Sequence, residues 1–193
     1  VSKTYMKNLF LCLAILIASL GFYNLLAAEE YKNSDFSIQI PETWRVVVLD
    51  KEGASRSWLF GKQATENESG VSVAVHIIEL HDPEFYSESD LLMTKDRWLN
   101  KNIHTMGKSK QVINTSIIYD EIIDGENFRA VNFRSLFDVQ NHPDLKLKIF
   151  GRVYLTIIDS KVITVNFQAS ESHEEKTKPE LEKVVETIRF IGK

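Results

Sequence analysis

Cysteine is nearly absent from this chain of 193 residues, because its one cysteine, Cys12, lies inside an apolar stretch near the start. Beyond Cys12 the chain has no thiol, which excludes disulfides, a cysteine nucleophile and a Cys-ligated zinc site. Only a few apolar residues precede Cys12, whereas a lipid-modified cysteine follows a complete hydrophobic region. The sequence therefore does not predict a lipoprotein.

Motifs for catalysis or cofactor binding are also missing: we find no glycine-rich phosphate loop, nucleophile elbow or His-Glu-x-x-His stretch. An excess of basic residues is missing too, since 23 Lys and Arg stand against 27 Asp and Glu. Binding to nucleic acid needs a basic face that neutralises phosphates. The sequence therefore favours a non-enzymatic protein that needs no cofactor and has no nucleic-acid partner.

The five histidines give no metal-binding pattern. His76 lies in an apolar run, where we expect a hydrogen-bonded core histidine rather than a ligand. His81 and His173 stand beside acidic residues in expected loops, without the spacing that puts two ligands on one metal. We expect solvated loop charges at both places and no metal site.

Residues 1–28 have the order of features of a secretory signal peptide. Lys3 and Lys7 supply a positive start, 9–26 is almost wholly apolar, and two alanines precede an acidic pair. The apolar run also approaches the ~20 residues that span a bilayer. The alternative is therefore an uncleaved N-terminal anchor, with membrane contact through residues 9–28 only. Both alternatives place the rest of the chain outside the cytoplasm, in the periplasm or the extracellular space.

Residues 29–193 are long enough for one domain with a full-sized core. Without Lys3 and Lys7 the chain has 21 basic and 27 acidic side chains, a net charge of −6. Such a mildly acidic surface favours solubility. We therefore expect two parts, a targeting segment at 1–28 and a single soluble domain at 29–193.

Period-two alternation of apolar side chains predicts many strands in that domain. The predicted strands cover 36–40, 44–49, 57–61, 71–80, 112–119, 127–137, 146–158 and 161–169, with a short edge strand within 188–191. The run 71–80 is apolar on both of its faces, so we expect both sides of the sheet to be buried there.

Two amphipathic helices are predicted beside these strands. The first starts near Ser87 or Ser89, either of which can cap its first amides. Its apolar positions are Leu92, Leu99, Ile103 and Met106. The second has Pro179 in its first turn, where proline is favoured. Its apolar positions are Leu181, Val184, Val185 and Ile188. Helices and strands together predict an α+β domain with an antiparallel sheet flanked by helices.

The last two long strands predict a hairpin whose register follows from their apolar residues. Opposite residues of antiparallel strands share a face. If both apolar sets lie on one face, Leu155 must stand opposite Val165, which requires the three-residue loop 159–161. We therefore expect that loop rather than the more common two-residue turn.

This register predicts a polar patch on the opposite face of the central strands. Its residues are Arg134, Arg152, Tyr154, Asn166 and Gln168. Guanidinium, phenol and amide groups can hold an anion or a polar chain. The alternatives are a solvated sheet face and a face that a helix covers.

Both ends of the domain resemble a known family. The stretch Phe36-Ser-Ile-Gln-Ile-Pro41-Glu-Thr-Trp44 is similar to the opening of PsbP-like and DcrB-like proteins. The stretches 162–169 and 185–190, with Pro179 between them, resemble that family's last hairpin, helix and terminal strand. The resemblance covers roughly 31–191. It implies an α/β/α sandwich and a non-enzymatic accessory or binding role, and it assigns no functional residue.

Three hypotheses follow for the function. The first is an exported accessory or binding protein of the cell envelope that acts through contacts with an envelope or exported protein. The alternative is a carrier of a small ligand or an anion that uses the polar patch. The third is an enzyme of a type that the sequence does not reveal.

Overall fold

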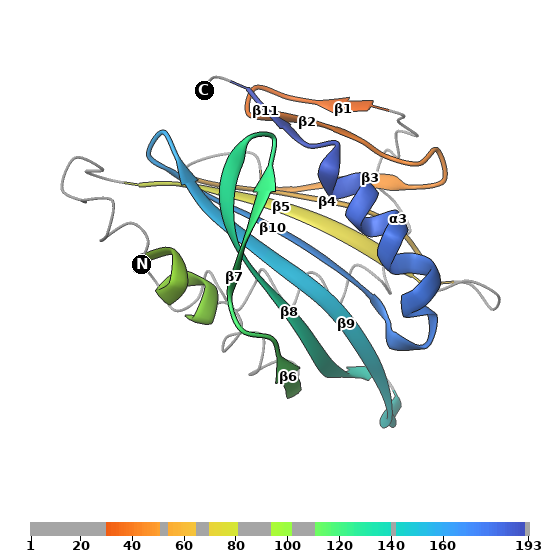
Figure 1. Cartoon of the computed structure of the whole chain (residues 1–193). Coiled ribbons are helices and arrows are strands. Elements are labelled where there is room, and N and C mark those ends of the chain that lie inside the picture. Colours follow the sequence, from red (N-terminus) through yellow and green to blue (C-terminus); the bar gives the residue numbers. More distant parts are fainter. Residues whose placement is uncertain are drawn as a thin grey trace.

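The computed structural model describes residues 30–50, 54–64, 70–80, 94–101, 111–139 and 142–191 (Figure 1). The predicted signal segment and both ends of the first predicted helix lie outside these residues. Within the described ranges, no helix combines the length and the apolar character that a membrane span requires.

The main sheet is antiparallel, and β8 (Glu126–Val139) and β9 (His142–Ile158) are its longest strands. Its order is β3-β4-β5-β10-β9-β8, with β6 and β7 both paired to the far side of β8. The other members are β3 (Arg45–Asp50), β4 (Ser55–Lys62), β5 (Val71–Glu79), β6 (Gln111–Thr115), β7 (Tyr119–Ile123) and β10 (Lys161–Ser170). Most of the predicted strands are confirmed.

The predicted strand 112–119 is wrong in one respect, because the chain forms β6 and β7 there instead of one strand. Asn114 stands opposite Arg134, but Tyr119 stands opposite Ala130. The register on β8 thus shifts by one residue between them, so a single continuous ladder cannot serve both. Asn132 and Ser116 fill the gap with two hydrogen bonds, from Ser116 N to the Asn132 carbonyl and from Asn132 N to Ser116 Oγ, each 3.0 Å long.

A smaller sheet joins the two ends of the domain, with the order β1-β2-β11. Its strands are β1 (Glu30–Lys32), β2 (Phe36–Gln39) and β11 (Arg189–Phe190). Phe36 and Ile38 of β2 are buried in the main core, as their alternation predicts. The expected terminal edge strand is therefore confirmed as β11, which pairs with β2.

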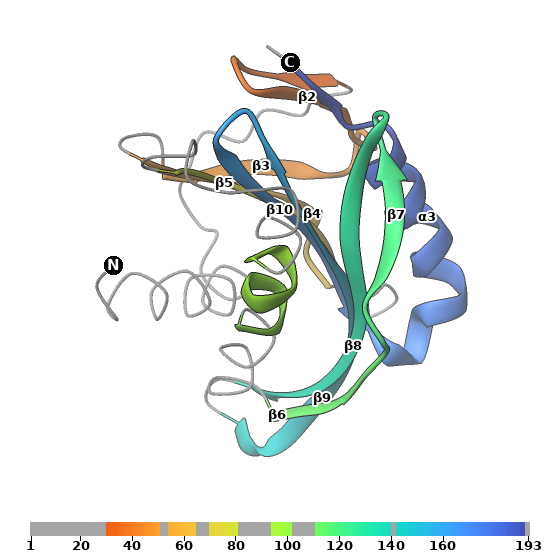
Figure 2. The ribbon, with the colours of Figure 1, turned by 60° about the vertical axis from the view of Figure 1, so that its left-hand side comes forward.

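Both faces of the main sheet are covered (Figure 2). One face, here called the outer face, carries α3 (Glu174–Glu186) and the small sheet. The opposite, inner face carries the helical residues 94–101, which bring Leu99 against Val153 and Leu155. The result is a helix–sheet–helix arrangement, so the predicted α+β class is confirmed.

The expected register of the last hairpin is wrong. Val165 stands opposite Tyr154, and Leu155 stands opposite Thr164, which leaves a two-residue turn at Asp159-Ser160. Asp159 and Ser160 have φ of 44° and 64°, the left-handed values of a type I′ turn. The prediction failed because it assumed a single buried face. Since both faces are buried, Leu155 packs on the inner face and Val165 on the outer face.

The start of the closing helix also differs from the prediction, because α3 begins at Glu174 and contains Pro179 in its interior. Proline cannot donate the backbone hydrogen bond that would reach the carbonyl four residues earlier. That carbonyl belongs to Glu175, an exposed residue on the solvent side, where water can satisfy it. The predicted apolar stripe is confirmed, since Leu181, Val184 and Val185 are buried.

Candidate functional site

The corrected register divides the predicted polar patch between two faces. Arg152 stands opposite Asn132 and Phe167, and Tyr154 opposite Val165, so both point to the outer face. Arg134 shares that face, as its alternation with Asn132 predicts. Alternation along β10 puts Asn166 and Gln168 on the inner face instead. The structure therefore brings Arg134, Arg152 and Tyr154 together on the outer face. The other two predicted residues do not belong to this group. Binding of a ligand by any of the five stays a prediction.

Arg152 lies in the middle of the outer face and is only 8% exposed. Its Nε donates to Asn132 Oδ1 at 2.7 Å, and its Nη1 lies 3.1 Å from the Tyr154 hydroxyl. Its two ion pairs are with Glu121 of β7 at 3.2 Å and with Glu182 of α3 at 2.8 Å. Arg152 thus ties an edge strand and a helix to the central sheet, and carboxylates of the chain already occupy its guanidinium.

Burial dominates the electrostatics of the Tyr154 phenol. Tyr154 is fully buried, and this loss of water raises its pKa well above the ordinary value of 10, although the Arg152 cation opposes the rise. Burial by itself lowers the pKa of Arg152, but the neighbouring phenols and Glu121 outweigh it, so that pKa is raised. Arg152 therefore stays charged and Tyr154 stays neutral at physiological pH.

Arg134 holds the beginning of α3 against the sheet. Its guanidinium forms ion pairs with Glu171, just before the helix, and with Glu174, the first residue of α3, the second at 2.7 Å. The hydrogen bond to Glu174 is the main reason why the pKa of Arg134 is raised. Arg134 is more exposed than Arg152 and lies at the rim of a pocket.

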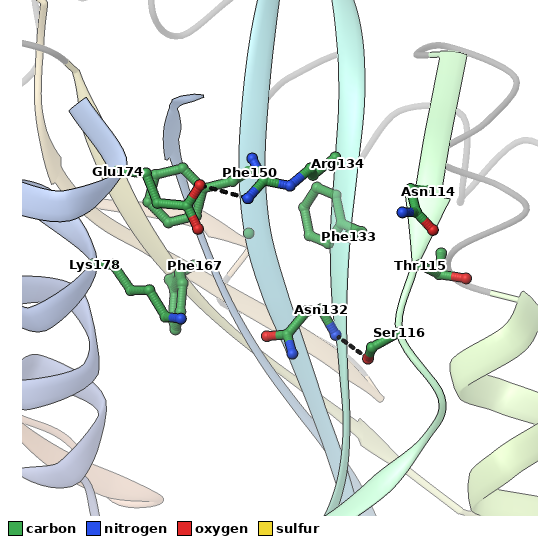
Figure 3. A pocket seen from close by; sticks show the side chains of 11 residues that line it. Asn114, Thr115, Ser116, Asn132, Phe133, Arg134, Phe150, Phe167, Glu174 and Lys178 are labelled. Carbon is green, nitrogen blue, oxygen red and sulfur yellow. Dashed lines mark hydrogen bonds and ion pairs between the residues drawn. The ribbon is translucent and has the colours of Figure 1, made fainter. Parts of the chain in front are cut away.

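That pocket has a volume of about 290 Å³ and lies on the outer face of the sheet, between α3 and β6 (Figure 3). Its lining combines buried aromatic rings with polar side chains that come from β6, β8 and α3. The lining residues are Asn114, Thr115, Ser116, Asn132, Phe133, Arg134, Phe150, Gly151, Phe167, Glu174 and Lys178. A small pocket with an apolar floor and a few polar groups is typical of a ligand site.

The edge of the sheet beyond β8 exposes large apolar side chains. Ile113 in β6 is 56% exposed, Ile117 in the connection is 85% exposed, and Ile122 in β7 is 74% exposed. Across the residues that the structure describes, only Leu147 joins them as a large exposed apolar side chain. No described strand pairs with β6 or β7 on the edge that faces away from β8.

The expectations for the histidines have mixed outcomes. The hydrogen bond expected for His76 is present, with its Nδ1 2.5 Å from the hydroxyl of buried Ser57, but His76 itself is only half-buried and not a core residue. His173 lies just before α3, 2.9 Å from the Ser172 hydroxyl. His81 lies outside the described residues. Within the described part of the chain, no group of three His, Cys, Asp or Glu could hold a metal.

Sequence reasoning did not find Lys178 or the exposed isoleucines as candidates. Lys178 follows Glu174 by four residues, so both lie on one side of a helix. That spacing was available, but nothing in the sequence placed this side of α3 over Arg134. The residues 112–119 predicted a single strand and gave no sign of the change of register on either side of Ile117.

No protein-family model and no curated protein matches the sequence. Solved structures do match in shape. Cyanobacterial PsbP (CyanoP) from Synechocystis sp. PCC 6803 is 18% identical, covers 90% of this chain and 96% of its own, and has a TM-score of 0.51. LpqN of Mycobacterium tuberculosis, described as involved in cell envelope biogenesis, is 9% identical, with 81% and 83% covered and a TM-score of 0.45.

The Ran-binding protein Mog1p of Saccharomyces cerevisiae is 10% identical, with 88% of this chain and 97% of its own covered and a TM-score of 0.45. At such identities the likeness to PsbP is one of fold and says nothing of a shared ligand or partner. Strand alternation, the helix on each face and the likeness to CyanoP agree with the resemblance seen at the two ends of the domain. The chain therefore has the PsbP-like fold.

Proposed function

We propose that this protein is an exported, non-enzymatic binding protein of the cell envelope, and that it contacts a partner protein through the edge formed by β6 and β7. The observation that carries the proposal is the exposure of Ile113, Ile117 and Ile122 along this one edge. Export rests on the signal-peptide pattern of residues 1–28.

Physical chemistry gives this edge two means of binding. An edge strand presents unpaired backbone N–H and C=O groups that another polypeptide can use. When a partner covers large apolar side chains, removing their surface from water stabilises the complex by ~25 cal/mol per Å². At its β7 end the edge comes next to the small sheet that joins the two ends of the domain (Figure 1), because Asp124, just after β7, accepts a hydrogen bond of 2.9 Å from Phe190 N of β11.

The test is photo-crosslinking in living cells, with a photoreactive residue in place of Ile117. The matched control carries the same residue in place of Thr43, which is also exposed to solvent but lies in the turn before β3. We expect a discrete protein adduct from position 117 and none from position 43. Tyr154 is unsuitable for this test because it is fully buried.

A second variant makes the result quantitative. Ile117→Asp places a charge in the expected interface, and loss of an apolar anchor at a binding hot spot costs ~2 kcal/mol or more. We expect at least about a tenfold loss of the crosslinked partner's affinity, which follows from ~1.4 kcal/mol per factor of ten. Identical adducts from positions 117 and 43, or unchanged affinity of Ile117→Asp, would contradict the proposal.

A further inference from the structure

We propose that the pocket between α3 and β6 binds a small organic anion with a single carboxylate, and that Lys178 is its anchor. This site goes beyond the proposed protein contact and does not depend on it. It also moves the carrier hypothesis away from Arg152 and Tyr154, on which the sequence had placed it.

Among the residues that the structure describes, Lys178 is the cation of this pocket without a carboxylate partner. Of the two cations in the lining, Arg134 is paired with Glu171 and Glu174. Lys178 forms no ion pair with any described residue, and its side chain extends from α3 into the hollow (Figure 3). An ammonium group in that position can donate charge-assisted hydrogen bonds to a carboxylate.

The charges around the pocket permit one negative charge on the ligand and disfavour a second. Arg134 and Lys178 contribute two positive charges, and Glu171 and Glu174 contribute two negative charges. The empty site is therefore neutral, and one carboxylate leaves it with a single excess negative charge. A dianion such as a phosphate ester would bring a second negative charge close to Glu174, which like-charge repulsion disfavours.

The rest of the lining indicates which chemical groups the ligand carries beyond its carboxylate. Phe150 and Phe167 form an aromatic floor, with ring centroids 6.4 Å apart, and favour an apolar or aromatic group. At the opposite rim, Asn114 and Thr115 of β6 make no side-chain hydrogen bond with a described residue. The Asn114 amide, which shares the outer face with Arg134, can meet a polar substituent, whereas Thr115 stands opposite Phe133 and points to the inner face. A volume of about 290 Å³ suits a small molecule rather than a lipid tail.

The experiment compares two probes of nearly the same shape on the exported protein purified from cells. The probes are 3-phenylpropionate and its neutral amide, 3-phenylpropanamide, titrated into ¹⁵N-labelled protein and followed by NMR. We expect saturable shifts at Asn114, Asn132 and Lys178, with an affinity at least about threefold higher for the carboxylate than for the amide.

Two matched variants assign this preference to the anchor. Lys178→Gln should bind both probes equally, whereas Lys183→Gln, which removes an exposed lysine of the same helix, should keep the full preference. Both variants should keep the wild-type melting temperature, since neither lysine is buried.

Equal affinities of the two probes for the wild-type protein, or no saturable binding of either, would overturn the proposal even if Lys178→Gln failed to fold. An unchanged preference in folded Lys178→Gln would overturn it as well. None of these outcomes bears on the β6–β7 edge, which the crosslinking at position 117 tests separately.

Discussion

The centre of the main sheet and its β6–β7 edge reverse the usual placement of side chains. At the centre, a charged arginine and a tyrosine are buried, and every contact of Arg152 is made within the chain. At the edge, Ile113, Ile117 and Ile122 are exposed, although burial would stabilise them. At the centre, contacts between polar groups stabilise the fold. At the edge, the exposed apolar groups contribute little to its stability.

This difference separates fold from function. A buried charge persists in a protein when partners of the chain compensate it, and removing one partner destabilises the fold. An exposed apolar side chain contributes little to the fold, so a series of them along one edge points to an interface. Changes at the centre should therefore lower stability, and changes at the edge should alter binding alone.

The largest effect is expected for Arg152→Ala. The change leaves the carboxylates of Glu121 and Glu182 without the cation that pairs with both and removes the hydrogen bonds to Asn132 and Tyr154. We expect the free energy of unfolding in urea to fall by ~3 kcal/mol. Lys183→Ala, a change at an exposed position of α3, is the control and should stay within ~0.5 kcal/mol of wild type.

A second change shows whether the charge pairing is the cause. In Arg152→Ala, the additional change Glu182→Gln removes one uncompensated carboxylate and should restore part of the lost stability. If the double variant is less stable than Arg152→Ala, the packing of the arginine matters more than its charge.

An intermediate effect is expected from Tyr154→Phe at alkaline pH. The folded-state pKa of Tyr154 is raised, so its stabilising contribution is complete below pH ~10 and is lost as the pH rises towards that raised pKa. One such group makes the free energy of unfolding fall by up to ~1.4 kcal/mol per pH unit. Tyr154→Phe should therefore lose stability less steeply than wild type between pH 10 and 12.

Near pH 7 the same variant should lose ~1 kcal/mol, because the hydroxyl no longer accepts from Arg152. Chemical denaturation at several pH values measures both effects. Parallel stability curves for the two proteins above pH 10 would mean that Tyr154 does not titrate with the unfolding of the chain.

The smallest effect is expected at the edge. Ile122→Thr keeps a β-branched side chain on β7 and removes most of the exposed apolar surface, since Ile122 is 74% exposed. We expect a change in the free energy of unfolding of less than ~0.5 kcal/mol. Val131→Thr, a change in the buried inner layer, is the contrast and should cost more than ~1 kcal/mol. A loss at Ile122 as large as that at Val131 would remove the distinction between edge and centre.

The local pattern predicted most of the elements correctly. Alternation located β2, β3, β4 and β5 within a few residues, because the side chains of a strand must alternate between two faces. It could not show that 112–119 breaks into two strands, since that depends on the register along β8. The candidate site was predicted less well, because a shift of one residue in pairing moved Asn166 and Gln168 to the other face.

By itself, the sequence determined the class of fold, the alternation within each strand, the apolar stripe of α3 and the lack of a thiol beyond Cys12. These are local properties, set by spacing and composition. Only the tertiary structure decided the register of the last hairpin, that carboxylates occupy Arg152, and that Lys178 and Asn114 line opposite sides of one pocket. Those facts join residues that are distant along the chain, and register and helix placement depend on the burial of the whole core rather than on any one segment.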